Sequence, residues 1–103
     1  MEPDGISVAG FPEGTLMDFQ DTSFSREHRY SLGLETESGR RYLSIPVSNG
    51  LVDYEEYYEI SATDHERYGL DNPAAAAFAD ECRRHEHDEL LIQKPGWNRG
   101  SAV

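Results

Sequence analysis

Cysteine and lysine each occur once in this sequence, and both shortages exclude something. With Cys82 as the only thiol, no disulfide can form within the chain, so nothing ties the fold to an oxidising compartment. Lys94 is the only lysine, and 20 acidic residues stand against 9 basic ones, for a net charge of -11. Such a chain is repelled by phosphate backbones and by anionic lipid. Nucleic acids and membranes are therefore excluded as unassisted partners, whereas a basic protein fits the sign of the charge.

Long apolar runs and catalytic motifs are missing as well. No segment approaches the roughly 18 apolar residues that a membrane helix needs, and the N-terminal MEPDGISVAG lacks the basic and apolar regions of a signal peptide. We therefore expect a cytoplasmic protein. The sequence contains no phosphate-binding glycine loop, dinucleotide-binding motif, zinc-protease motif or hydrolase nucleophile motif. No cofactor is implied, and we expect a binding protein rather than an enzyme.

The length of 103 residues suits one domain. Glycine and proline punctuate residues 1–14, which predicts an irregular lead-in. A single α+β domain is expected over 15–94, followed by a tail over 95–103 that is anchored if Trp97 packs.

Alternation of apolar and polar residues indicates two strands in the middle of the chain, RYSLGLET and RYLSIPVS. The segment ESGR between them predicts one hairpin. Asn49–Gly50 predicts a second, because both positions of a tight hairpin turn take positive φ. Counting from these turns places Leu34 opposite Leu43 and Val47 opposite Val52. The apolar side chains then fall on one face of the sheet.

Two tight turns cannot both flank the central strand, because alternate residues of an antiparallel strand bond to alternate neighbours. A four-residue loop over Glu37–Arg40 removes this conflict. Pro46 has no N–H, so we expect a bulge or a missing bond beside it, or a strand at the edge of the sheet. A first strand is predicted over 15–21, a polar connection over 22–27 and a last strand over 89–94.

Two helices are predicted in the second half of the chain. Thr63 begins a capping-box pattern, so a short helix is expected over about 64–68. Asp71 or Asn72 caps the main helix, which is expected over about 73–87. The predicted fold is α+β: an antiparallel meander of three to five strands with both helices packed on one face.

The segment VDYEEYYEI, 52–60, is dense in acids and tyrosines. Asn49–Gly50 and the aromatic residues favour a strand here over a helix, and a strand separates the side chains into two rows. The outer row is either the solvated face of an ordinary strand or a docking surface for an Arg- or Lys-rich protein or a second copy of the chain. The core row holds Val52, Tyr54, Glu56, Tyr58 and Ile60. The outer row holds Leu51, Asp53, Glu55, Tyr57 and Glu59, beside Tyr42 of the preceding strand.

Glu56 is the anomaly of the core row, because an unpaired buried carboxylate costs several kcal/mol or takes up a proton. Glu56 either reaches water, pairs with Arg41 or another arginine, or is turned outward by a bulge. The alternative is a ligand-facing carboxylate in a pocket with Tyr54 and Tyr58, with His85 as a proton carrier.

Glu81, Cys82 and His85 share one helical face, but they are too few for a zinc site because His87 points elsewhere. We expect no metal site. We also expect Cys82 to be packed under the sheet and unreactive.

Three functions are consistent with these patterns. The leading hypothesis is a small protein-binding or regulatory domain, of which an inhibitor or immunity protein for a basic partner is one version. The second is a small-ligand-binding or enzymatic domain with a pocket around Tyr54, Glu56, Tyr58 and His85. The third is a homo-oligomeric accessory protein whose sheet face is its own interface. The predicted docking residues are Tyr42, Leu51, Asp53, Glu55, Tyr57 and Glu59.

Overall fold

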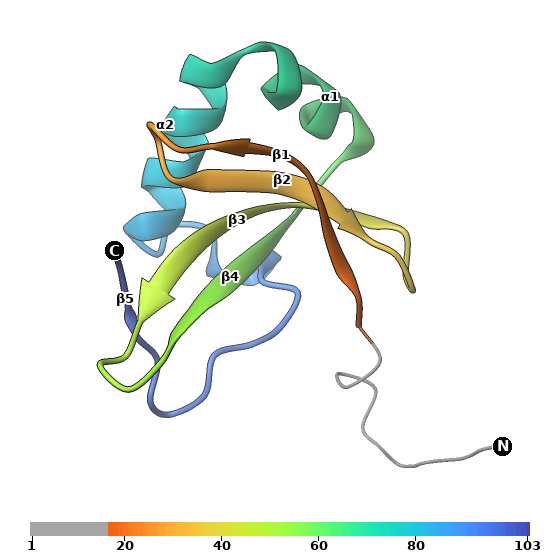
Figure 1. The fold of residues 1–103 in the computed structure, drawn as a ribbon. Helices are drawn as coiled ribbons and strands as arrows, with labels where there is room; N and C mark the ends of the chain where they lie inside the picture. Colours follow the sequence, from red (N-terminus) through yellow and green to blue (C-terminus); the bar gives the residue numbers. More distant parts are fainter. Residues whose placement is uncertain (1–16) are drawn as a thin grey trace, which may run out of the picture.

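The computed structural model describes residues 17–103, so the lead-in expected over 1–14 lies outside the described residues. The fold is α+β, as predicted. An antiparallel meander runs in the order β1-β2-β3-β4, and a short fifth strand pairs with β3. Two helices lie together on one side of the sheet (Figure 1). The elements are β1 (Phe19–Ser25), β2 (Tyr30–Glu35), β3 (Arg40–Ser48), β4 (Asp53–Ile60), α1 (Ala62–Leu70), α2 (Asn72–Arg83), the 3-10 helix η2 (Asp88–Leu90) and β5 (Ser101–Ala102).

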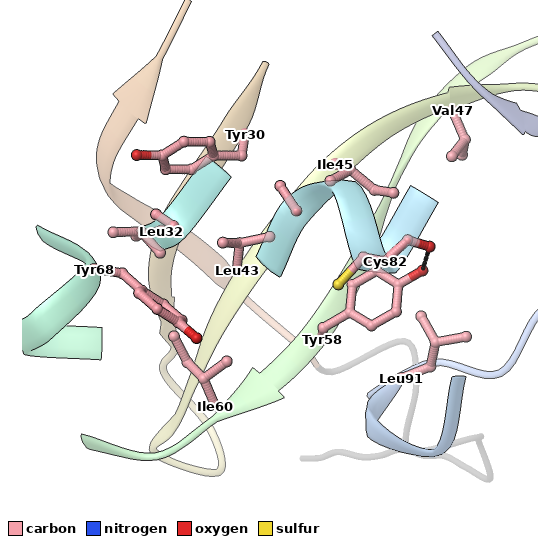
Figure 2. Close-up of a cluster of buried hydrophobic side chains, with 12 residues drawn as sticks. Tyr30, Leu32, Leu43, Ile45, Val47, Tyr58, Ile60, Tyr68, Cys82 and Leu91 are labelled. Atoms are coloured by element: carbon pink, nitrogen blue, oxygen red, sulfur yellow. Dashed lines mark hydrogen bonds between the residues drawn. The ribbon is translucent and has the colours of Figure 1, made fainter. Parts of the chain in front are cut away.

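One hydrophobic core fills the space between the helices and the inner face of the sheet (Figure 2). Alternate residues of β2, β3 and β4 point into it, which confirms most of the predicted core row. Ala75 and Ala79 of α2 are fully buried, and their small side chains let this helix lie close to the sheet. The Tyr58 hydroxyl oxygen lies 3.3 Å from the Cys82 carbonyl oxygen (Figure 2). The core residues are Tyr30, Leu32, Leu43, Ile45, Val47, Tyr58, Ile60, Tyr68, Ala75, Ala79, Cys82 and Leu91.

The pairing of the strands differs from the prediction by two residues at both hairpins. Leu32, not Leu34, lies opposite Leu43, and Tyr54, not Val52, lies opposite Val47. A shift by two leaves each strand residue on its expected face, because side chains alternate with that period. Val52 is the exception, since it lies in the turn and is exposed.

The first turn is a four-residue loop, as predicted, but it covers 36–39 and is capped by the side chain of Glu35. The Glu35 carboxylate accepts hydrogen bonds from the Ser38 hydroxyl at 2.5 Å and from the Ser38 and Glu37 N–H groups at 2.8 and 3.1 Å. The Ser38 hydroxyl is the largest cause that lowers the pKa of Glu35 to about 2. This carboxylate therefore fixes where the hairpin reverses.

The second turn also spans four residues, 49–52, so the tight turn predicted at Asn49–Gly50 is wrong. The Asn49 side-chain oxygen accepts from the N–H groups of Leu51 and Val52 at 3.0 Å each. Asparagine widens the turn in this way by imitating a backbone acceptor. Only Gly50 within the turn has a positive φ, 90°.

Pro46 lies in a central strand, and its missing N–H falls at a gap in the ladder. β2 pairs with β3 only as far as Ser44, and β5 begins opposite Val47. The Pro46 carbonyl accepts from the Val103 N–H at 3.2 Å on this same side. Since both backbone groups of a strand residue point to one neighbour, the missing donor faces the space between β2 and β5. The expected break in the ladder is therefore present.

Strand β1 begins at Phe19 and continues to Ser25, so most of the connection predicted over 22–27 is wrong. The register against β2 slips between Asp21 and Ser23, which leaves Thr22 as an extra residue. Such a bulge twists an exposed edge strand and discourages pairing with other chains.

Both helices are capped by side chains, although the first is longer than predicted. Ser61 rather than Thr63 caps α1, and its hydroxyl accepts from the Asp64 N–H at 3.0 Å. Asp71 caps α2, as predicted. This helix ends at Arg83 rather than 87, and the chain leaves helical geometry fully at His85, where φ is 63°.

The C-terminal segment is held by polar contacts instead of the predicted strand over 89–94. Leu91 makes a single bridge to Tyr58. The Arg99 guanidinium donates to Glu56 at 2.8 and 3.0 Å and to Asp88 at 2.9 and 3.0 Å. Trp97 is 96% exposed, so it is not the anchor of the tail.

Arg99→Ala is expected to lower the free energy of unfolding by about 3 kcal/mol, because it leaves the buried Glu56 without a cation. Arg99→Lys keeps the charge but loses the forked geometry and should fall in between. The control is Arg40→Ala, which removes an exposed pair with Glu59 at 3.8 Å and should cost less than about 1 kcal/mol. Urea unfolding measures all three; equal losses for Arg99→Ala and Arg40→Ala would contradict the proposed anchoring.

The stability difference between the wild-type protein and Arg99→Ala should also depend on pH. The bonds from Arg99 are the largest cause that holds the pKa of Asp88 below its ordinary value of 3.8. A lowered pKa stabilises the fold above the ordinary value, and this contribution is lost as the pH falls. The stability difference between the wild-type protein and Arg99→Ala should therefore shrink below about pH 4.

Candidate functional site

The face of the sheet opposite the helices is the candidate site, because no helix in residues 17–103 covers it (Figure 1). Its side chains come from alternate positions of neighbouring strands. Six of them lie together and are called here the open-face cluster: Phe19 and Asp21 from β1, Tyr42 and Ser44 from β3, and Glu55 and Tyr57 from β4.

Three aromatic rings pack together in the open-face cluster. Phe19 stacks on Tyr57 with ring centroids 3.7 Å apart, and Tyr42 meets these rings edge-on at 5.5 and 4.9 Å. Such pairs are worth about 0.5–1.5 kcal/mol beyond the area they bury. The contacts therefore tie β1, β3 and β4 together on a face that has no helix over it.

Tyr42 is buried, with 0% of its surface accessible, so its predicted place in an exposed docking surface is wrong. Gly33 lies directly opposite on β2 and leaves room for the ring. A Cβ at Gly33 would overlap the Tyr42 hydroxyl and the Gln20 carbonyl oxygen. The hydroxyl donates to Asp21 at 2.5 Å; burial first, and then this bond, raise the pKa of Tyr42. Tyr42 thus supports the cluster, and Tyr57 is its partly exposed tyrosine.

Glu55 is a partly buried carboxylate without an ion pair among the described residues. Burial is the largest cause that raises its pKa, and among the neighbouring charges Asp21, which raises it, acts more strongly than Arg29, which lowers it. Neither Glu55 nor Asp21 forms an ion pair within residues 17–103. The local balance of charge at Glu55 is therefore negative.

The Ser44 hydroxyl is buried and makes no hydrogen bond in the described structure, although the residue is only 1% exposed. It is near enough to Glu55 to lower the pKa of that carboxyl, but not in bonding geometry. A buried hydroxyl without a partner costs about 1–3 kcal/mol. Ser44 lies opposite Ser31, which lines an adjoining cavity of about 270 Å³. That cavity is lined mainly by Phe24, Arg26, Arg29, Ser31, Pro46 and Glu55.

The remaining predicted docking residues lie around the cluster, with one exception. Asp53 and Glu59 are exposed near the two ends of β4, on the same face as Glu55. Glu59 forms an exposed ion pair with Arg40, at 3.8 Å. Leu51 lies in the turn 49–52 and is 88% exposed, so it is beyond the strand and not on the sheet face.

The alternative pocket around Glu56 is occupied by the protein's own groups. Glu56 is 6% exposed, and its oxygens accept from Arg99 and from the Tyr58 hydroxyl, the latter at 3.0 Å. This is the expected pairing with an arginine. Tyr54 accepts from a backbone N–H and, with Glu56, lines a cavity of about 200 Å³ between β4 and residues 93–98. His85 lies exposed beyond the end of α2.

Other reactive chemistry is scarce in the described part of the chain. Residues 17–103 hold no group of three or more His, Cys, Asp or Glu arranged to bind a metal ion. Neither of their helices has the length and apolar character needed to cross a bilayer. Cys82 is buried, and burial raises the pKa of its thiol, so the thiol stays protonated and unreactive.

Sequence reasoning missed Phe19, Asp21 and Ser44 as members of the site. The bulge at Thr22 interrupts the alternation of β1, so Phe19 and Asp21 could not be assigned to the site. Ser44 is a polar residue on the outer face of a strand, which by itself indicates no site. Gly33 was the available signal, because a lone glycine within a strand marks a bulge or the close approach of another group. Here that group is the Tyr42 ring.

The chain matches no protein-family model, no curated protein and no solved structure. Its function is therefore inferred from the open face itself. The arrangement offers an aromatic surface and unpaired acceptors, which suit the binding of a cation.

Gly33→Ala is expected to lower the free energy of unfolding by about 2–3 kcal/mol, because the new methyl group would displace Tyr42. The matched control is Gly69→Ala. Gly69 lies in α1, where a Cβ meets no atom within 4 Å, so this change should stabilise the protein by up to about 1 kcal/mol. Urea unfolding measures both. If Gly33→Ala were as stable as the wild type, Tyr42 would not pack against β2 as described.

Proposed function

We propose that this protein is a binding domain that captures a basic segment of another protein on the sheet face that no helix covers within residues 17–103. Glu55 is the observation that carries the proposal: it is partly buried, lies beside Asp21 and has no ion pair within residues 17–103. Holding a carboxylate out of water without a cation is unfavourable. A guanidinium or ammonium group of a partner would relieve that cost. An inhibitor or immunity protein for a basic partner is one version of this function.

The rest of the face suits the same partner. Tyr57 and Phe19 present stacked rings, over which an arginine or lysine side chain gains cation–π attraction. Asp53 is exposed on the same strand and extends the negative surface beyond the cluster. The net charge of -11 would also steer a basic partner toward the protein and raise the association rate.

Two other functions are less well supported by the geometry. A second copy docked through the same face would bring two negatively charged surfaces together, and like charges across an interface repel. A catalytic or ligand-binding role for Glu56 lacks a free carboxylate, because Arg99 and Tyr58 already occupy its oxygens. A basic protein segment is therefore the favoured partner.

The test is a titration with an octa-arginine peptide, followed in amide NMR spectra at about 0.15 M salt, where distant charges are screened. Peptide binding should shift the signals of Phe19, Tyr42, Glu55 and Tyr57. Glu55→Gln should weaken binding about tenfold, which is the effect of losing roughly 1.4 kcal/mol. The matched control is Glu66→Gln, which removes the same charge from the exposed surface of α1 and should change the affinity less than about twofold.

An octa-glutamate peptide should leave the spectra unchanged. If octa-arginine shifted signals evenly over the whole protein, or if Glu55→Gln and Glu66→Gln weakened it equally, the binding would reflect net charge alone. Either result would falsify the proposed function. Self-association detected by sedimentation, with protection of the same signals, would favour the homo-oligomer instead.

A further inference from the structure

We infer that the cavity beside Glu55 is a pocket for a single arginine side chain of the bound segment. This inference deepens the proposed function and rests on it. The volume of about 270 Å³ lies below the usual range for drug-sized ligands and suits one side chain.

The floor of the cavity offers acceptors to the incoming group. Ser31 and Glu55 line it, and Ser44 lies directly opposite Ser31 and diagonally from Glu55 on the same face. The Ser44 hydroxyl is buried and has no partner in the described structure. A guanidinium group carries five N–H donors in a fixed fork, so it can reach a carboxylate and neighbouring hydroxyls together, which an ammonium does less well.

Part of the cavity lining is apolar. Phe24 is 65% exposed and Pro46 is half-buried, and both line the cavity. The three methylene groups of arginine can pack against such surface while the charged end reaches the floor. A flat guanidinium also stacks well on an aromatic ring.

Two arginines of the protein also line the cavity, and they oppose an incoming cation. Both Arg26 and Arg29 are exposed, so water screens their charges more than that of the partly buried Glu55. Arg29 is turned toward the C-terminal segment, where its Nε donates to the Val103 carbonyl at 3.0 Å. Asp21 also outweighs Arg29 in its effect on Glu55. Glu55 is therefore the acidic group of the lining that an incoming cation would meet, beside two exposed arginines whose charges water screens.

The probe for this pocket is acetyl-arginine methylamide, titrated into the full chain and followed by amide NMR. We expect saturable shifts at Phe24, Ser31, Ser44 and Glu55, with a dissociation constant of about 1–50 mM for so small a ligand. Acetyl-lysine methylamide should bind several-fold more weakly, and the norleucine and glutamate analogues should not bind. Binding of the glutamate analogue in preference to arginine would show an anion site around Arg26 and Arg29 and would overturn the inference.

Ser44→Ala and Glu55→Gln are the informative variants. Ser44→Ala removes a hydroxyl that makes no hydrogen bond within residues 17–103, so its urea midpoint should not fall, yet its affinity for the arginine probe should drop several-fold. Glu55→Gln should abolish measurable binding. Glu66→Gln, on the exposed surface of α1, is the control that should leave binding unchanged. An unchanged affinity in both Ser44→Ala and Glu55→Gln would refute the pocket.

The pH dependence of probe binding tests the role of Glu55, because a purely structural role of this residue would not make the affinity follow its ionisation. The groups around Glu55 are Asp21, Arg26, Arg29, Tyr42 and Tyr57. A cation binds the ionised form of Glu55, whose pKa is raised above its ordinary 4.5. Binding of the probe should therefore rise with pH through a midpoint above 4.5. A pH-independent affinity would exclude Glu55 as the acceptor.

The outcomes separate this inference from the proposed function. If octa-arginine binds the open face while the single-residue probe does not bind the cavity, the pocket is wrong and the proposed function stands. If the probe binds and the peptide does not, the pocket stands as a small-cation site and the proposed function is wrong. If neither binds, both are wrong.

Discussion

Strand β3 bonds to two neighbours through alternate residues, and the rest of the structure depends on this arrangement. It pairs with β4 on one side and with β2 and then β5 on the other. Its side chains alternate between the two faces of the sheet, so Leu43 and Ile45 enter the core beneath the helices while Tyr42 and Ser44 belong to the open face. The helices can cover only the first set. The same alternation places the side chains of the open-face cluster on the opposite face of the sheet.

The faces of these strands could be predicted from the sequence, whereas their pairing could not. Apolar alternation fixes which residues share a face, and this survives any even shift in register. The register itself depends on how each turn closes. Glu35 and Asn49 close the turns with their side chains, and each moves the pairing by two residues. A turn rule based on the Asn-Gly pair alone does not consider that the Asn49 side chain can accept the hydrogen bonds that close a wider turn.

The contacts that anchor the tail lay outside local sequence reasoning for a different reason. Arg99 meets Glu56 across 43 positions of sequence, and no periodicity connects them. Trp97 looked like the natural anchor because it is large and apolar, yet it stays exposed. Full burial of a large apolar side chain gains about 3 kcal/mol, while a buried carboxylate without a cation costs several. The observed anchor of the tail is therefore the pairing of Arg99 with Glu56 and not the burial of Trp97.

The positions of Tyr42 and Gly33 show the limit of assigning exposure from alternation. Alternation correctly places Tyr42 on the face away from the helices. Burial does not follow from the face alone, because rings from β1 and β4 and the bare backbone of β2 enclose Tyr42 there. A face without a helix can therefore hold a small second core. In this protein that second core carries carboxylates at its margin, which an ordinary core would exclude.

Glu55 and Glu56 make this contrast sharpest, since they are neighbours in sequence and point to opposite faces of β4. Both are drawn out of water on folding. Arg99 and Tyr58 replace the water that Glu56 loses, whereas Glu55 has no ion pair within residues 17–103 and lies near only the Ser44 hydroxyl. Arg29 lies near enough to Glu55 to lower the pKa of its carboxyl. It does not pair with Glu55; instead, its Nε donates to the Val103 carbonyl. Local rules of this kind are broken chiefly at functional sites. Under the proposed function, the free energy that folding forgoes at Glu55 and Ser44 would be recovered when a partner's cation binds to acceptors that are already held in place.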